Sequence, residues 1–154
     1  MNELAPGGAR LDIAELKIVT TKFRRAIERC DRRRLSITFR YFPKGSCGDA
    51  ALLLRAFLLE RGLGTFRYAL GWLDRDDGRH SHAWLEAGGI VVDITADQFP
   101  EIDEEVIVTE NSPWHAAIRL DEDEQETDYR RYDPNTVADL DASYDAILVE
   151  FDHL

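Results

Sequence analysis

The spacing of apolar residues changes along the chain from a helical to a strand-like period near residue 65. Over residues 11–30, apolar positions recur every three or four residues, which predicts a helix. Residues 47–61 carry a broad apolar face that ends at two glycines, which predicts a second helix. The segment 36–42 between them is rich in β-branched and aromatic residues, which favours a strand or an extended segment.

Beyond residue 65, apolar and polar residues alternate as they do in half-buried strands. Turn residues interrupt this alternation at Asp74–Gly78 and at Gly88-Gly89. The strands predicted in this way are 65–73, 80–86, 90–95 and 106–109. On the first of them, one face is expected to carry Phe66, Tyr68, Leu70 and Trp72.

Helices followed by an antiparallel meander are typical of the α+β class. The length of 154 residues fits one domain over 1–154, with 44% hydrophobic and 32% charged residues as in globular proteins. Within it we expect a loose N-terminus over 1–10, an acidic loop over 121–135 and a C-terminal helix over 136–151.

The charge and the composition exclude several classes of function. A net charge of -11 argues against nucleic-acid binding, because contacts with phosphate need a surplus of basic residues. The sequence has no apolar run long enough to span a membrane, and its first residues do not resemble a secretory signal. Two cysteines are too few for a disulfide framework. We therefore expect a cytoplasmic protein that binds neither nucleic acid nor membranes and uses no cofactor.

Cys47 lies where a predicted loop becomes a helix, in the segment Gly45-Ser46-Cys47-Gly48-Asp49. Ser46 is a favourable N-cap, and Asp49 is placed to complete a capping box with it. In the first turn, the helix dipole and free N–H groups favour a thiolate. The backbone N–H groups of Cys47 and Gly48 could also bind an oxyanion. The alternative is a buried, inert cysteine, which is what we expect of Cys30.

A predicted hairpin brings a histidine and an aspartate together. His80, His82 and Trp84 alternate on one strand and share a face. A two-residue turn at Gly88-Gly89 pairs Trp84 with Asp93, which makes Asp93 the diagonal neighbour of His82. One alternative is that both side chains are merely solvated. Another is a metal site formed by His80, His82, Asp93 and Cys47, but none of the usual metal-ligand spacings is present, and no metal is expected.

A thiol at a helix N-terminus, an imidazole on a strand and a carboxylate on the next strand form the pattern of a Cys-His-Asp triad. Three motifs in this order resemble the transglutaminase-like superfamily of cysteine enzymes. They are Gly45-Ser46-Cys47-Gly48-Asp49, Ser81-His82-Ala83-Trp84-Leu85-Glu86 and Val92-Asp93-Ile94-Thr95.

The resemblance implies a papain-like α+β core with the N-terminal helices packed on the antiparallel meander. It implies Cys47 as nucleophile, His82 rather than His80 as base, and Asp93 as the residue that orients His82. The implied chemistry is acyl transfer on an amide of a peptide or protein, by hydrolysis, glutamine deamidation or transamidation. The chain departs from the family at Gly48, where many members have an aromatic residue.

Two further residues are candidates for supporting roles. Trp84 shares the face of His82, and Gln98 is a polar candidate for the side-chain member of an oxyanion hole. The pair Trp114-His115 follows Ser112-Pro113, and we interpret it as a loop entering a packed segment, with Trp114 in or beside the core. The alternative to an enzyme is a non-catalytic module that binds a peptide or protein with the same fold.

Overall fold

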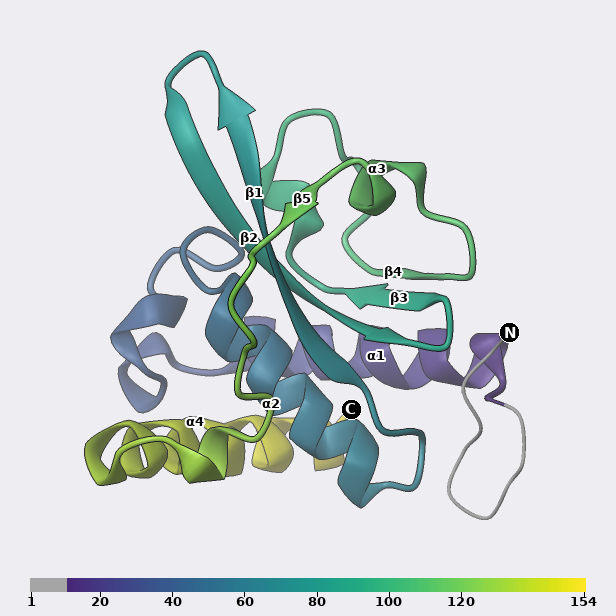
Figure 1. Cartoon of the computed structure of the whole chain (residues 1–154). Coiled ribbons are helices and arrows are strands. Elements are labelled where there is room, and N and C mark those ends of the chain that lie inside the picture. The colour runs from purple at the N-terminus through teal and green to yellow at the C-terminus, as the bar shows by residue number, and fades with distance from the viewer. Residues whose placement is uncertain (1–10) are drawn as a thin grey trace.

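The computed structural model describes residues 11–154, which form an α+β fold (Figure 1). These residues contain a five-stranded antiparallel sheet in the order β4-β3-β2-β1-β5. The strands are β1 (Arg67–Arg75), β2 (Gly78–Ala87), β3 (Ile90–Asp93), β4 (Ile107–Thr109) and β5 (Arg119–Leu120). The helices are α1 (Ile13–Arg29), α2 (Cys47–Glu60), α3 (Pro113–Ala116) and α4 (Pro134–Asp152). The α+β class and the three long predicted helices are thus confirmed, while the predicted loose segment 1–10 lies outside the described residues.

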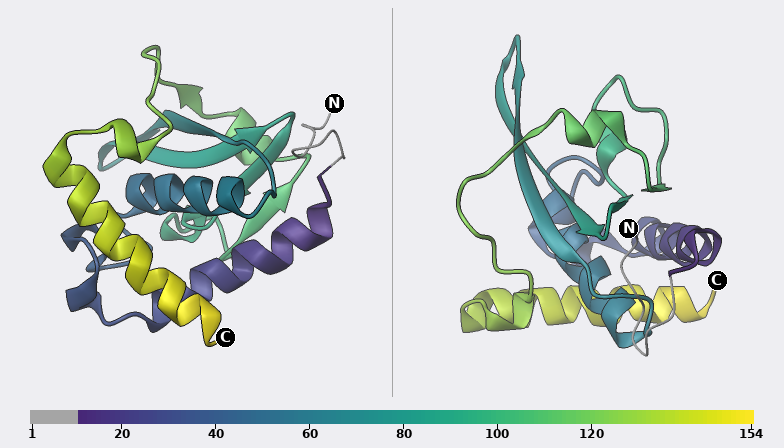
Figure 2. Two further views of the ribbon diagram at one scale, coloured as in Figure 1. Left: turned by 90° about the horizontal axis from the view of Figure 1, so that it is seen from below. Right: turned by 45° about the vertical axis from the view of Figure 1, so that its right-hand side comes forward.

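Helix α2 is the centre of the larger of two apolar cores. Figure 2 shows it between the sheet and the pair α1 and α4. Its Phe57 ring lies 5.1 Å from the ring of Phe23 on α1 and 4.8 Å from that of Phe151 on α4. Leu85 and Val92 of the sheet belong to the same core. This packing sets the position of the first turn of α2, and therefore of Cys47.

A smaller apolar core covers the opposite face of the sheet. Trp84 and Val91 pack there with Phe99 and Ile118, which come from the segments before β4 and after α3. The strand period on β1 is as predicted, but the face with Tyr68, Leu70 and Trp72 is only half-buried. The alternate residues Ala69, Gly71 and Leu73 are more deeply buried, because the α3–β5 segment covers their side.

The hairpin between β2 and β3 has the predicted register. Ala87 pairs with Ile90 and Glu86 with Val91 across the Gly88-Gly89 turn. Both turn glycines have positive φ, 51° and 86°, which a two-residue turn of this kind requires. The paired ladder ends at Leu85 and Val92, so the predicted pairing of Trp84 with Asp93 is absent, although Asp93 directly follows the last pair.

The expectation of a strand or an extended segment over 36–42 is wrong. The chain there forms a short 3-10 turn, Ile37–Phe39, and a second 3-10 turn, Arg32–Arg34, precedes the segment. Phe39 is completely buried, whereas Ile37 is 70% exposed, so the apolar residues of this segment do not form one strand face. The backbone N–H of Ser36 donates to the hydroxyl of Ser143 on α4 at 2.7 Å. Its acceptor is therefore a side chain of a helix and not the backbone of a neighbouring strand. Among residues 11–154, no helix has the length and apolar character needed to cross a membrane.

Candidate active site

Cys47 is the first residue of α2 and is partly exposed. The predicted capping box is wrong: the Ser46 hydroxyl donates to the carbonyl of Pro43, and the Asp49 carboxylate accepts from the Thr38 hydroxyl at 2.5 Å. The first helical hydrogen bond runs from the N–H of Ala50 to the carbonyl of Ser46. Within the described part of the chain, the N–H groups of Cys47 and Gly48 therefore have no acceptor.

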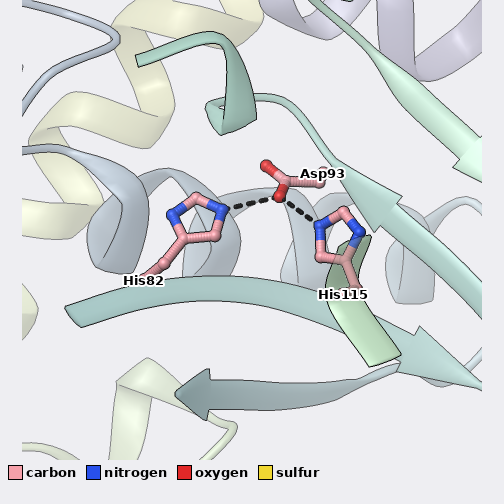
Figure 3. A group of neighbouring side chains, drawn as sticks. All are labelled: His82, Asp93 and His115. Atoms are coloured by element: carbon pink, nitrogen blue, oxygen red, sulfur yellow. Dashed lines mark hydrogen bonds and ion pairs between the residues drawn. The ribbon is translucent and has the colours of Figure 1, made fainter. Parts of the chain in front are cut away.

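His82 and Asp93 meet as the hairpin register predicts. His82 Nε2 lies 2.6 Å from Asp93 Oδ2, and the two residues are 0% and 2% exposed (Figure 3). Asp93 Oδ1 accepts a further hydrogen bond from the N–H of Thr95 at 2.9 Å. A buried carboxylate needs such donors, because without them its desolvation would be costly. The contact fixes which imidazole nitrogen faces Asp93 and leaves Nδ1 for another partner.

The protonation of this pair follows from its surroundings. Burial by itself lowers the pKa of His82, but attraction to Asp93, the hydrogen bond with Asp93 and the interaction with the Cys47 thiol together raise it to about 9. Burial likewise raises the pKa of Asp93, but attraction to His82 and the hydrogen bonds from His115 and His82 leave it below its ordinary value. At neutral pH, His82 is therefore a charged imidazolium that is held by a buried carboxylate.

Gln98 lies on the remaining side of the imidazole. Its Nε2 is 3.3 Å from His82 Nδ1 and donates to the carbonyl of Thr95 at 3.1 Å. The ring of Trp84 stacks on that of His82 with centroids 5.8 Å apart, and Phe99 approaches it edge-on at 5.2 Å. Both residues named from the sequence as supporting candidates, Trp84 and Gln98, are therefore neighbours of His82.

The other histidine of β2, His80, is not part of this group. His80 Nε2 contacts Asp77 at 2.9 Å, and the His80 side chain is 43% exposed. The alternative of a metal site that includes His80 is therefore not assembled in the structure. Cys47 lies in a narrow gap that is also lined by Trp84, Asp93 and Thr95. A cleft of about 430 Å³, lined in part by Lys44, Gln98 and Phe99, opens beside Gln98.

His115 is a member of the cluster that sequence reasoning missed. It is 3% exposed, and its Nε2 lies 2.7 Å from Asp93 Oδ2, the oxygen that also binds His82. The sequence contained a local signal for the short helix that carries His115, because Ser112-Pro113 is a pattern typical of a helix start. The contact with Asp93, 22 residues away along the chain, depends on how α3 packs over the sheet.

His82, Asp93 and His115 are also the residue types of a metal site, and within residues 11–154 they form a compact group. Both imidazole nitrogens, however, lie at hydrogen-bond distance from one and the same carboxylate oxygen. Ligand atoms around a metal ion stand about 2.0–2.2 Å from the ion and are correspondingly farther from one another. The observed geometry is that of a hydrogen-bonded cluster.

The structure thus brings His82 and Asp93 together and places Gln98 against His82. It puts Cys47 in the gap lined by Trp84 and Asp93, and it separates His80 from this group. The chain matches no protein-family model, no curated protein and no solved structure.

Proposed function

We propose that this protein is a cysteine-dependent acyl-transfer enzyme that acts on an amide of a peptide or protein through Cys47, His82 and Asp93. The observation that carries the proposal is the buried His82, whose Nε2 is held by Asp93 and whose pKa is raised to about 9 by Asp93 and Cys47. In the same proposal, α2 packed against the sheet corresponds to the helix and strands of a papain-like core.

In the first step, the Cys47 thiolate attacks the amide carbonyl carbon, and a C–S bond forms. The protonated His82 then gives its Nδ1 proton to the leaving nitrogen as the C–N bond breaks, which leaves a thioester on Cys47 and a neutral imidazole. Asp93 keeps the imidazole oriented by accepting from Nε2 throughout.

The oxyanion of the tetrahedral intermediate needs donors near Cys47. The free N–H groups of Cys47 and Gly48 at the start of α2 supply two of them, and the helix dipole has the favourable sign. The Gln98 amide is suited to supply a third, because one N–H donates to Thr95 and the other, which faces His82 Nδ1 at 3.3 Å, has no acceptor there once that nitrogen is protonated.

In the second step, water or an amine attacks the thioester carbon, and the neutral His82 accepts its proton. The C–S bond breaks and regenerates the thiolate and the imidazolium. Water gives hydrolysis or deamidation, and an amine gives transamidation. In this proposal, either acceptor enters through the cleft beside Gln98, on the Nδ1 side of His82.

The proposal is tested by acylation with p-nitrophenyl acetate, followed by intact-mass and peptide-mass measurement. We expect one acetyl group on Cys47 in the wild type and in Cys30→Ser, and none in Cys47→Ala. The resolving step is then sought by incubating the protein with a peptide library, with and without a primary amine. Acetylation of Cys30 at the rate of Cys47, or no acylation of Cys47, would contradict the proposal.

A further inference from the structure

A second imidazole reaches Asp93 from a distant part of the chain. His115 lies on α3, which packs over the face of the sheet that carries His82. In Figure 3 the rings of His82 and His115 approach the carboxylate of Asp93 from two sides. Their Nε2 atoms are 2.6 and 2.7 Å from the same oxygen, Oδ2. A triad requires only one of these contacts, so the other calls for an explanation.

The hydrogen-bond partners of His115 define its tautomer. An ionised carboxylate only accepts, so Nε2 of His115 carries the hydrogen that points to Asp93. Its Nδ1 lies 2.5 Å from the hydroxyl of Ser112, which donates to it when the ring is neutral. Ser112 also caps α3 and accepts from the backbone N–H of His115 at 3.4 Å. Ser112 and His115 are thus held together within one turn.

Tight packing keeps this second imidazole in place. The ring of Trp84 lies 5.0 Å from that of His115, and the ring of Trp114 lies 4.8 Å from it. His115 and Asp93 are 3% and 2% exposed, so water does not compete for the bond between them. In such surroundings a hydrogen bond constrains a side chain more strongly than it does at the surface.

We propose that His115 is a positioning residue, which acts through Asp93 to hold the carboxylate in the orientation that His82 needs. With His82 and His115 on Oδ2 and Thr95 on Oδ1, the carboxylate cannot rotate without breaking a buried hydrogen bond. In this proposal His115 contacts Asp93 and Ser112 and takes no direct part in the reaction at Cys47. The inference rests on the proposed function, because it assigns His115 a part in preparing Cys47 and His82.

The test compares His115→Leu, which removes the donor, with His115→Gln, whose amide N–H can replace Nε2–H. His153→Gln, at an exposed histidine near the C-terminus, is the matched control. The two measurements are the iodoacetamide alkylation rate of Cys47 and the downfield proton NMR signal of the His82 Nε2–H. In His115→Leu we expect broadening or loss of that signal and alkylation slower by about 10–100-fold, the range known for partners that orient metal-binding imidazoles. His115→Gln should recover most of the His82 signal and most of the alkylation rate of Cys47. His153→Gln should change neither the signal nor the rate.

A folded His115→Leu variant that keeps the His82 signal and the wild-type alkylation rate would overturn the inference. So would a His115→Gln variant that is as impaired as His115→Leu. If His115→Leu does not fold, Ser112→Ala tests the inference instead. It removes the hydroxyl that contacts Nδ1 of His115 and leaves the imidazole itself present. We expect a weakened His82 signal there, and an unchanged signal would count against the inference. Neither measurement needs amide turnover, so failure of the proposed function would appear separately, as an unreactive wild-type Cys47.

Discussion

At the scale of single residues, the two cysteines differ in what surrounds their sulfur atoms. Cys30 is buried at the end of α1, and burial together with the charge of Glu150 raises its pKa to about 11. Cys47 begins α2, is partly exposed and interacts with His82. We therefore expect iodoacetamide at about pH 6 to alkylate Cys47 long before Cys30, because the thiolate is the reactive form.

Peptide mass mapping over time measures the two rates in the same sample. Cys30→Ser should leave the rate at Cys47 unchanged. Equal rates at the two sites, or faster labelling of Cys30, would show that Cys47 is not the activated thiol.

His82 gives a second prediction at this scale. Its pKa is raised to about 9 against the opposing effect of burial, and Asp93 is the main cause of the rise. Replacing Asp93 with Asn removes the negative charge that raises the pKa of His82, while the burial that lowers it remains. The titration midpoint of His82 should therefore fall from about 9 to its ordinary value of about 6.5 or below. Histidine NMR from pH 5 to about pH 10 measures the midpoint, and a value that stays near 9 in Asp93→Asn would contradict the assignment.

At the scale of elements, one glycine allows the α3–β5 segment to approach the sheet. Gly71 on β1 is paired with His82 on one side and Leu120 on the other. A Cβ atom there would lie 2.4 Å from Ile118 Cγ2 and 3.1 Å from the carbonyl oxygen of Arg119. This close approach holds the segment that carries His115 against the sheet.

We expect Gly71→Ala to lower the free energy of unfolding by about 1–3 kcal/mol, as overpacking does. The matched control is Gly48→Ala in α2, where the nearest atom is the Tyr68 hydroxyl at 3.1 Å, at the end of a side chain. That change should stay within about 1 kcal/mol of the wild type, because alanine also suits a helix better than glycine. Urea unfolding of both variants measures the difference, and equal effects would refute the argument from close approach.

At the scale of the whole molecule, one buried arginine ties the helical layer to the loop behind the site. Arg24 of α1 is 3% exposed and binds the Asp97 carboxylate with two nitrogens, at 2.7 and 2.9 Å. It also donates to the carbonyls of Ile94 and Glu105. The turn Ala96–Gln98, which carries Gln98, is thereby anchored to α1.

Replacing Arg24 with Met should lower the free energy of unfolding by about 3–5 kcal/mol, because it leaves buried acceptors without a donor. Arg25→Met is the control: its side chain is 45% exposed and pairs with Glu28 and Glu105 at the surface. Such surface pairs contribute about 0–1 kcal/mol. Thermal and urea unfolding measure both variants, and a loss of less than about 1 kcal/mol in Arg24→Met would show that the anchor is not structural.

Much of this fold and part of its site could be predicted because the responsible interactions are local. The helices follow from the apolar period, and the β2–β3 register follows from two glycines at positive φ. The contact between His82 and Asp93 is a consequence of that register. The Ser46–Asp49 capping box was also a local expectation, and it failed because Thr38, from a segment outside the helix, binds Asp49 instead.

By itself, the sequence determined the three long helices, the strands of the β1–β3 meander and the contact between His82 and Asp93, since each depends on neighbours a few residues apart along a helix or a hairpin. Only the tertiary structure decided that residues 36–42 turn to meet Ser143, that Gln98 lies beside His82, and that His115 shares the carboxylate of Asp93. These contacts join segments that are 16 to 107 residues apart. Their partners are selected by the packing of whole layers, and no period or turn signal along the chain specifies them.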